Sequence, residues 1–237
     1  MSFSEILAEL PKGEASQQLI LNNRGLADVD SLARLSELKK LELRGNRLSR
    51  LRFVEANEAL CWLALAGNRL TKIDHLQRLT SLAVLDISDN QISALTGLSE
   101  LRSLKALIAA RNRITQVTGI ASTMHPALET LVLSHNQIEE CALSDFAALK
   151  KVSLSHNKLC AFPALQRLPE LAELRLNGNQ LPALGACVAE LDKLSLLDIG
   201  SNLIKNVDDL KPLLGLQWLK NLSLFGNACA PDRDSPP

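Results

Sequence analysis

Apolar residues in this chain follow one pattern that returns every 21 to 25 residues. The pattern is L-x-x-L-x-L-x-x-N-x-L, and one repeat that fits it contains Leu38, Leu41, Leu43, Asn46 and Leu48. The asparagine of successive repeats stands at Asn46, Asn68, Asn90, Asn112, Asn136, Asn157, Asn179, Asn202 and Asn227. A period of this length, repeated along most of a chain, indicates a solenoid in which each repeat is one structural unit.

Each repeat is predicted to contain a strand and a return segment. The x-L-x-L-x stretch alternates, which places the leucines on one side of a short strand and the intervening residues on the other. The second half carries an apolar residue at every third position, as in Ile73, Leu76 and Leu79, which is the spacing of a 3-10 turn or short helix. The predicted fold is therefore an α/β right-handed solenoid, or horseshoe, with about ten parallel strands on its concave face and 3-10 or short helical segments on its convex side.

The asparagine of the pattern has a structural explanation. Its amide can donate and accept hydrogen bonds at once, so stacked asparagines can satisfy backbone groups left unpaired where each strand ends. Glycine precedes the asparagine at Gly45, Gly67, Gly178 and Gly226, where it is expected to relieve crowding at the turn.

The chain is predicted to divide into three segments. Residues 1–15 are expected to form an N-terminal capping helix, because Ser2 or Ser4 precedes an acidic and apolar run. Residues 16–229 are assigned to the repeats, the first of which is degenerate because Arg24 stands where the asparagine is expected. Residues 230–237 are expected to be a disordered tail. Since no aromatic closing segment follows the last repeat, we expect either that the chain is part of a longer protein or that something else covers an exposed apolar edge of the last repeat, and we favour the first interpretation.

The repeat pattern resembles the leucine-rich repeat subclass of about 22 residues that is typified by a regulatory subunit of protein phosphatase 1. Axonemal dynein light chain 1, the spliceosomal A-prime protein and the acidic nuclear phosphoproteins are similar members. The resemblance covers about residues 16–229. It implies the horseshoe fold, whereas the motif is not specific for function.

Charge and composition exclude several classes of partner. Twenty-six basic and twenty-six acidic residues give a formal charge of zero, so no overall field attracts nucleic acid or an anionic membrane. No uncharged apolar run is long enough to cross a bilayer. We therefore expect a monomer that contacts neither nucleic acid directly nor a membrane.

Candidate chemistry is sparse, and neither enzymatic activity nor a cofactor is expected. The five cysteines lack metal-site spacing and are interpreted as free thiols in the cytoplasm or nucleus, with Cys61 pointing inward as a small apolar filler. His135 and His156 occupy one position in adjacent repeats and are expected to lie near each other, but two histidines without a third ligand make a poor metal site. His75 and His125 fall in convex or loop segments and have no evident partner.

The residues between the leucines are expected to line the concave face. We call the apolar ones near its centre the concave patch: Trp62, Ala64, Ala66, Val84, Ala106, Ile108, Ala110 and Val132. Charged side chains are expected to wall this patch: Lys40, Glu42, Arg44, Asp86 and Arg111. Farther along the face lie Lys151, Glu173, Arg175, Asp198 and Phe225. An exposed apolar patch with a polar rim is typical of a protein interface, and mixed charge favours a protein partner over nucleic acid.

The predicted function is a protein-binding scaffold, and three alternatives remain. A phosphatase regulatory subunit, with a phosphatase catalytic subunit as partner, is implied by the resemblance. The positions comparable to its acidic and aromatic concave residues are Glu42, Trp62, Asp86, Glu173, Asp198 and Phe225. The alanine-rich centre and the interleaved bases depart from that pattern. A ribonucleoprotein component and an axonemal or cytoskeletal adaptor are also compatible with the fold.

Overall fold

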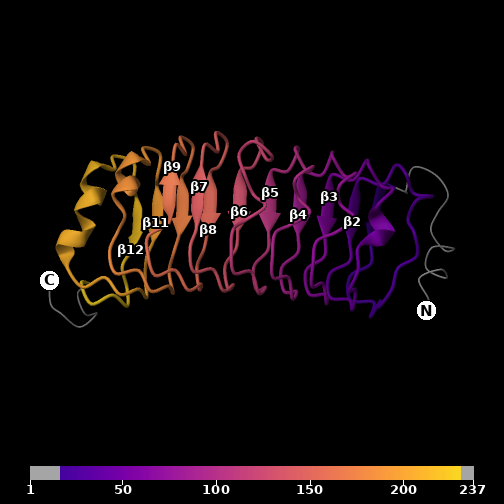
Figure 1. Ribbon diagram of the computed structural model, residues 1–237, viewed down its shortest axis with the longest axis horizontal. Helices are drawn as coiled ribbons and strands as arrows, with labels where there is room; N and C mark the ends of the chain where they lie inside the picture. The colour runs from indigo at the N-terminus through magenta and orange to yellow at the C-terminus, as the bar shows by residue number, and fades with distance from the viewer. Residues whose placement is uncertain (1–16, 231–237) are drawn as a thin grey trace.

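Ten short parallel strands form one continuous sheet along the length of the molecule (Figure 1). The structure is a computed structural model that describes residues 17–230. The strands are β1 (Gln18–Ile20), β2 (Lys40–Glu42), β3 (Trp62–Ala64), β4 (Val84–Asp86), β5 (Ala106–Ile108), β6 (Thr130–Val132), β8 (Lys151–Ser153), β10 (Glu173–Arg175), β11 (Leu196–Asp198) and β12 (Asn221–Ser223). The predicted solenoid with about ten parallel strands is confirmed. The capping helix expected for residues 1–15 lies outside the described residues, as does all but Ala230 of the predicted tail.

The leucines of successive strands form the predicted apolar column. The register pairs Leu41 with Leu63, Leu63 with Leu85, and Leu85 with Leu107. All four side chains have no exposed surface. At the C-terminal end, Leu222 of β12 has a strand on one side only among the described residues and is 42% exposed.

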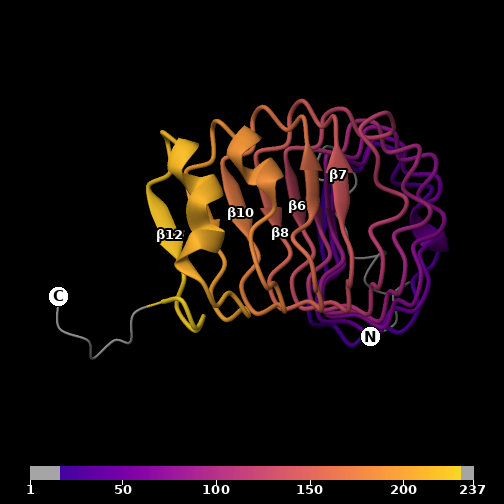
Figure 2. The same cartoon turned by 60° about the vertical axis from the view of Figure 1, so that its left-hand side comes forward.

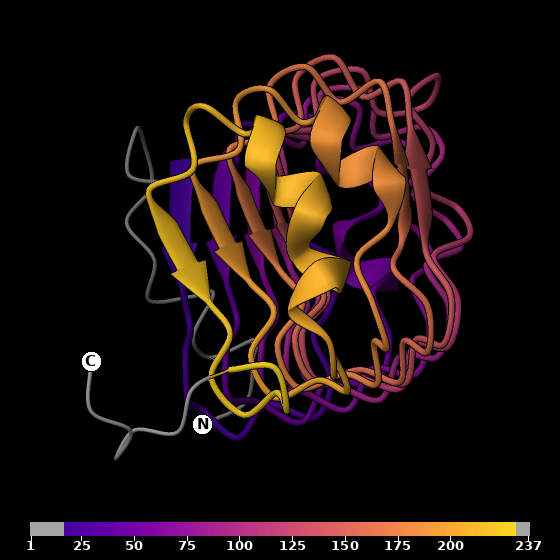
Figure 3. The same cartoon turned by 90° about the vertical axis from the view of Figure 1, so that its left-hand side faces the viewer.

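The convex side contains 3-10 segments, as predicted, and also a second small sheet. The 3-10 helices are η2 (Arg52–Val54), η3 (Ala186–Glu190) and η4 (Val207–Gly215). Strands β7 (Ala142–Ser144) and β9 (Ala164–Gln166) pair in parallel on the side of the coil opposite the large sheet (Figures 2 and 3). Their central leucines, Leu143 and Leu165, are buried while the flanking side chains are exposed. Among residues 17–230, no helix has the length and apolar character needed to cross a membrane.

The stacked asparagines satisfy backbone groups at the end of each strand, as predicted. The Oδ1 atom of Asn90 accepts a hydrogen bond of 2.9 Å from the backbone N–H of Leu70. Its Nδ2 atom donates to the carbonyl oxygens of Leu65 and Ile87, each at 3.0 Å. Each asparagine thus links its own repeat to the preceding one, and the pattern recurs at Asn68 and Asn112.

The residue before each asparagine adopts a left-handed backbone conformation. This conformation, more specifically than crowding, explains why glycine stands at four of these positions. Gly45 and Gly67 have φ values of 65° and 69°. The same position is held at positive φ by Asp89, Arg111, His135, His156 and Ser201. Glycine adopts this conformation without a Cβ penalty, whereas the other residues adopt it because the asparagine hydrogen bonds on either side fix the turn.

Two glycines in the return segments allow close approach of the preceding repeat. Gly97 has φ of +88°, and a Cβ atom there would lie 2.3 Å from the carbonyl oxygen of Ile73. Gly119, one repeat later, has the same φ, and its Cβ would lie 2.3 Å from the carbonyl oxygen of Leu95. These glycines are required both by conformation and by space.

Gly97→Ala is expected to lower the free energy of unfolding by about 2 kcal/mol, because the new methyl group combines positive φ with a clash against backbone. Chemical denaturation monitored by circular dichroism measures this change. Gly215→Ala is the matched control, since no atom lies within 4 Å of its Cβ position. Equal stability of the two variants would contradict the packing explanation.

Two polar residues replace a convex leucine of the repeat. Asn57 and His125 occupy the position of Leu79 and Leu101, and both are fully buried. Asn57 Nδ2 donates to the carbonyl oxygen of Leu32 at 3.0 Å, and His125 Nε2 lies 3.0 Å from the carbonyl oxygen of Leu98. The expectation that His125 has no partner is therefore wrong.

Candidate functional site

Side chains of the large sheet form rows on its concave face, because neighbouring strands are in register. One row contains Trp62, Val84 and Ala106, from β3, β4 and β5. The next row contains Ala64, Asp86, Ile108 and Val132, from β3 to β6. Ala66 and Ala110 lie two residues after the ends of β3 and β5 and are half-buried. The strand register thus gathers the predicted residues of the concave patch on neighbouring strands.

Trp62 is the largest apolar side chain in this group. It is 36% exposed, so part of the residue is available to a partner. The ammonium group of Lys40 lies 5.7 Å from the ring centroid, and the same group pairs with Glu42 at 2.9 Å. The cation over the ring restricts Trp62 without burying it.

Asp86 lies within the concave patch rather than at its wall. The register places it between Ala64 and Ile108, where it is 8% exposed. Its carboxylate pairs with Arg44 at 3.2 Å and accepts a hydrogen bond of 3.1 Å from the backbone N–H of Ser88. Ala64 is fully buried and supplies no exposed surface, which corrects the expectation for that residue. The larger accessible apolar side chains of the patch are therefore Trp62, which is exposed, and Val84, Ile108 and Val132, which are half-buried.

The charged residues beside the patch are paired with one another. Hydrogen bonds from Lys40 and Asn22 hold the pKa of the Glu42 carboxyl below its ordinary value. Arg111, at the turn after β5, lies 3.8 Å from Asp89. The patch consequently has a rim of opposed charges with little net field.

The remaining predicted residues lie farther along the same face. Glu173 of β10 accepts from Lys151 at 3.0 Å and from Arg175 at 2.6 Å. Burial raises the pKa of the Glu173 carboxyl, but these two hydrogen bonds outweigh it, and the pKa lies below its ordinary value. Asp198 of β11 accepts from the backbone N–H of Gly200, and Phe225 follows β12 with 62% of its surface exposed.

Polar side chains that the sequence reasoning did not single out separate these two groups. Ser134 and Ser153 join through their hydroxyl groups at 2.6 Å, and the Ser155 hydroxyl donates to Asn177 Oδ1 at 2.5 Å. Serine in the variable positions of two neighbouring repeats was the available signal. The concave face therefore changes from apolar to hydroxyl-rich after β6.

The histidine pair forms as expected. The rings of His135 and His156 stack with centroids 4.3 Å apart and planes 12° from parallel. Burial, followed by the neighbouring His156 and Arg111, lowers the pKa of His135 against an opposing effect of Asp89. Within residues 17–230, no group of three or more His, Cys, Asp or Glu residues is arranged to hold a metal ion.

Two further residues differ from the sequence expectation. Cys61 is exposed rather than an inward filler, because it precedes the first residue of β3 and its thiol points toward the carbonyl oxygen of Ala59. His75 does have a partner, because its Nδ1 atom lies 3.5 Å from Glu55. Cys141 is buried, and that burial raises the pKa of its thiol to about 12.

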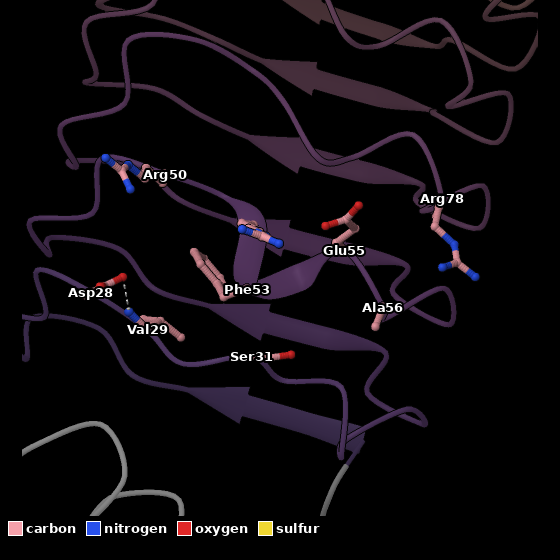
Figure 4. Close-up of a pocket in the computed structure, with 9 residues that line it drawn as sticks. Asp28, Val29, Ser31, Arg50, Phe53, Glu55, Ala56 and Arg78 are labelled. Carbon is pink, nitrogen blue, oxygen red and sulfur yellow. Dashed lines mark hydrogen bonds between the residues drawn. The ribbon is translucent and has the colours of Figure 1, made fainter.

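A hollow of about 590 Å³ lies beside η2 (Figure 4). Its lining consists of Asp28, Val29, Ser31, Arg50, Arg52, Phe53, Glu55, Ala56 and Arg78. The Asp28 carboxylate accepts from the backbone N–H of Val29, and Ser31 accepts from that of Ala33. The lining contains no histidine or cysteine, and Ser31 has no base partner among the described residues, so nucleophilic catalysis is not indicated.

Comparison with known proteins agrees with the repeat assignment. Residues 61–161 match the family model described as leucine-rich repeat. The leucine-rich repeat domain of APL1B superposes with a TM-score of 0.77 at 22% identity, covering 94% of this chain and 67% of that one. At this identity the likeness concerns the fold alone.

Two relatives are about one third identical to this chain over the segments that align. The human serine/threonine-protein kinase 11-interacting protein is 36% identical over 104 residues, which are 43% of this chain and 10% of that protein. The acidic leucine-rich nuclear phosphoprotein 32 family member A of Drosophila pseudoobscura pseudoobscura is 36% identical over 112 residues, covering 42% of this chain and 43% of that protein. The chain therefore spans less than half the length of either relative.

Proposed function

We propose that this chain, a leucine-rich repeat protein, is a non-enzymatic scaffold that binds another protein on its concave face through the surface around Trp62. The observation that carries the proposal is the 36% exposure of Trp62 on a rigid sheet, next to the half-buried Val84. Tryptophan on a preformed surface loses little conformational entropy on binding and contributes a large contact area.

The electrostatics of the face support a protein partner. Lys40 pairs with Glu42, and Arg44 pairs with Asp86. Because these charges are already compensated, a partner can cover them without leaving an isolated buried charge. A groove that binds nucleic acid would instead present lysine and arginine side chains without acidic partners along the face.

No specific partner follows from these features. A phosphatase regulator would use acidic groups on the face, but Glu42, Asp86 and Glu173 are each held by bases of the same chain. Neither this alternative nor a ribonucleoprotein or axonemal role is favoured by a particular contact. A nuclear or cytoplasmic location is proposed, supported by the name of the nuclear phosphoprotein relative.

Affinity capture with the wild-type chain beside a Trp62→Ala variant tests the proposal. We expect at least one protein to be retained by the wild type and lost from the variant. Mass spectrometry identifies it, and a phosphatase catalytic subunit would be recognised directly. Identical protein sets for the two folded baits would contradict binding at Trp62.

A further inference from the structure

The strands of the large sheet end along one edge of the molecule, the lower edge in Figure 1. The turns at this edge carry a row of long polar residues. The row contains the residue that follows the repeated asparagine. Its basic members are Arg47, Arg69, Arg113 and Lys158. In the remaining repeats from residue 47 to residue 180, the same position is occupied by Gln91, Gln137 and Gln180. Seven consecutive repeats therefore have a basic or amide side chain and no acidic one at this position, and we call the row the turn edge.

Backbone hydrogen bonds hold the turn edge in a regular line. The N–H of Arg47 donates to the carbonyl oxygen of Leu26 at 2.7 Å. The N–H of Arg69 donates in the same way to Leu48, at 2.9 Å. The contact recurs at every member of the row, so the side chains start from equivalent points one repeat apart. A spacing of about 4.8 Å per strand gives the row a length of about 29 Å.

The basic members of the turn edge are free to bind an external acid. All four are exposed, and none belongs to an ion pair among residues 17–230. On the concave face, by contrast, Lys40, Arg44 and Arg175 each have an acidic partner. Arg111, which lies outside the turn edge, pairs with Asp89 at 3.8 Å. Glu139 lies near the C-terminal half of the row.

We propose that the turn edge binds an acidic segment of a protein in extended conformation. Arginine guanidinium groups form bidentate hydrogen bonds with carboxylates, and glutamine amides can bind the backbone of an extended chain. At about 3.3 Å per residue, a segment of about nine residues would cover the row. This surface is distinct from the concave patch and does not depend on it.

The same observations disfavour nucleic acid as the occupant. Single strands are held by aromatic side chains on which bases stack, and the turn edge contains no aromatic residue. The rings of His135 and His156, two residues before Gln137 and Lys158, are stacked on each other. The chain as a whole also has no net charge, whereas nucleic-acid-binding domains are strongly basic.

Fluorescence anisotropy with a labelled oligoglutamate of about ten residues tests the proposal on the full chain. We expect salt-sensitive binding that falls about tenfold in the triple variant Arg47→Gln, Arg69→Gln, Arg113→Gln. The control removes three exposed bases elsewhere that are also outside any ion pair of the described residues, Arg34→Gln, Arg102→Gln and Lys105→Gln, and should retain binding. Capture of a concave-face partner should be unchanged in the triple variant.

Three results would overturn the assignment. The first is wild-type affinity of the triple variant for oligoglutamate. The second is an equal loss in the control variant, which would mean that only total charge matters. The third is tighter binding of a single-stranded oligouridylate with the same number of charges, which would make the turn edge a nucleic-acid surface.

Discussion

Asn90→Ala is expected to lower the free energy of unfolding by about 3 kcal/mol. The side chain is 8% exposed and satisfies the backbone N–H of Leu70 and the carbonyl oxygens of Leu65, Ile87 and Ser88. Alanine leaves all four groups without that partner, and water has little access to replace it. Because each repeat contacts only its neighbours, a weaker interface at this repeat also reduces the cooperativity between the repeats before it and the repeats after it.

Equilibrium denaturation in urea, followed by circular dichroism, measures this loss. Asn221→Ala is the matched control, since that asparagine is exposed in β12 and forms no side-chain hydrogen bond among the described residues. We expect the control to change stability by less than about 0.5 kcal/mol. A result for Asn90→Ala as small as that would mean that the asparagine ladder contributes little to folding.

Most of the fold could be predicted because two residue types mark each repeat, leucine and asparagine, and each has one structural role. Leucine at the centre of each strand fixes which side faces inward, so Leu41, Leu63 and Leu85 form the expected column. The asparagine spacing fixes where each repeat ends. Both signals are local to one repeat and add up along the chain.

Features that depend on contacts between repeats were missed. The pattern gave no reason to expect β7 and β9, because a single leucine between exposed residues is too short to indicate a strand. Asn57 and His125 depart from the leucine pattern, and only the structure shows that each binds a carbonyl of the preceding repeat. Gly97 could not be predicted for the same reason, because the atom that excludes a side chain there is the carbonyl oxygen of Ile73, in the preceding repeat.

The sequence predicted which residues lie in the concave patch but not how much of each is exposed. Alternation correctly identified the side chains on this face, since strand register follows from the repeat. Exposure depends instead on contacts with neighbouring repeats. Ala64 is fully buried, and Asp86, which the register places within the patch, is 8% exposed and bound by Arg44 and the backbone N–H of Ser88.

The double variant Trp62→Ala, Ile108→Lys is expected to weaken binding of a concave-face partner at least about a hundredfold. Each residue lies on the accessible part of the patch, and removal of a central anchor in an interface typically costs about 2 kcal/mol or more, so two together amount to two decades or more. Lysine is chosen at position 108 because the register places this residue beside Asp86. An aspartate there would add a second carboxylate and destabilise the sheet itself.

The fold should tolerate these changes. Trp62→Ala removes the contact with Lys40, worth about 0.5 to 1 kcal/mol at an exposed site, and Ile108 is only half-buried. Thermal denaturation should therefore remain cooperative, while calorimetric titration with the captured partner reports the loss of affinity. Met124→Ala, at an apolar side chain that is 37% exposed outside the sheet, is the control and should bind normally. A folded double variant that binds its partner within about twofold of wild type would place the binding site elsewhere, because no interface centred on Trp62 could lose both apolar anchors without effect.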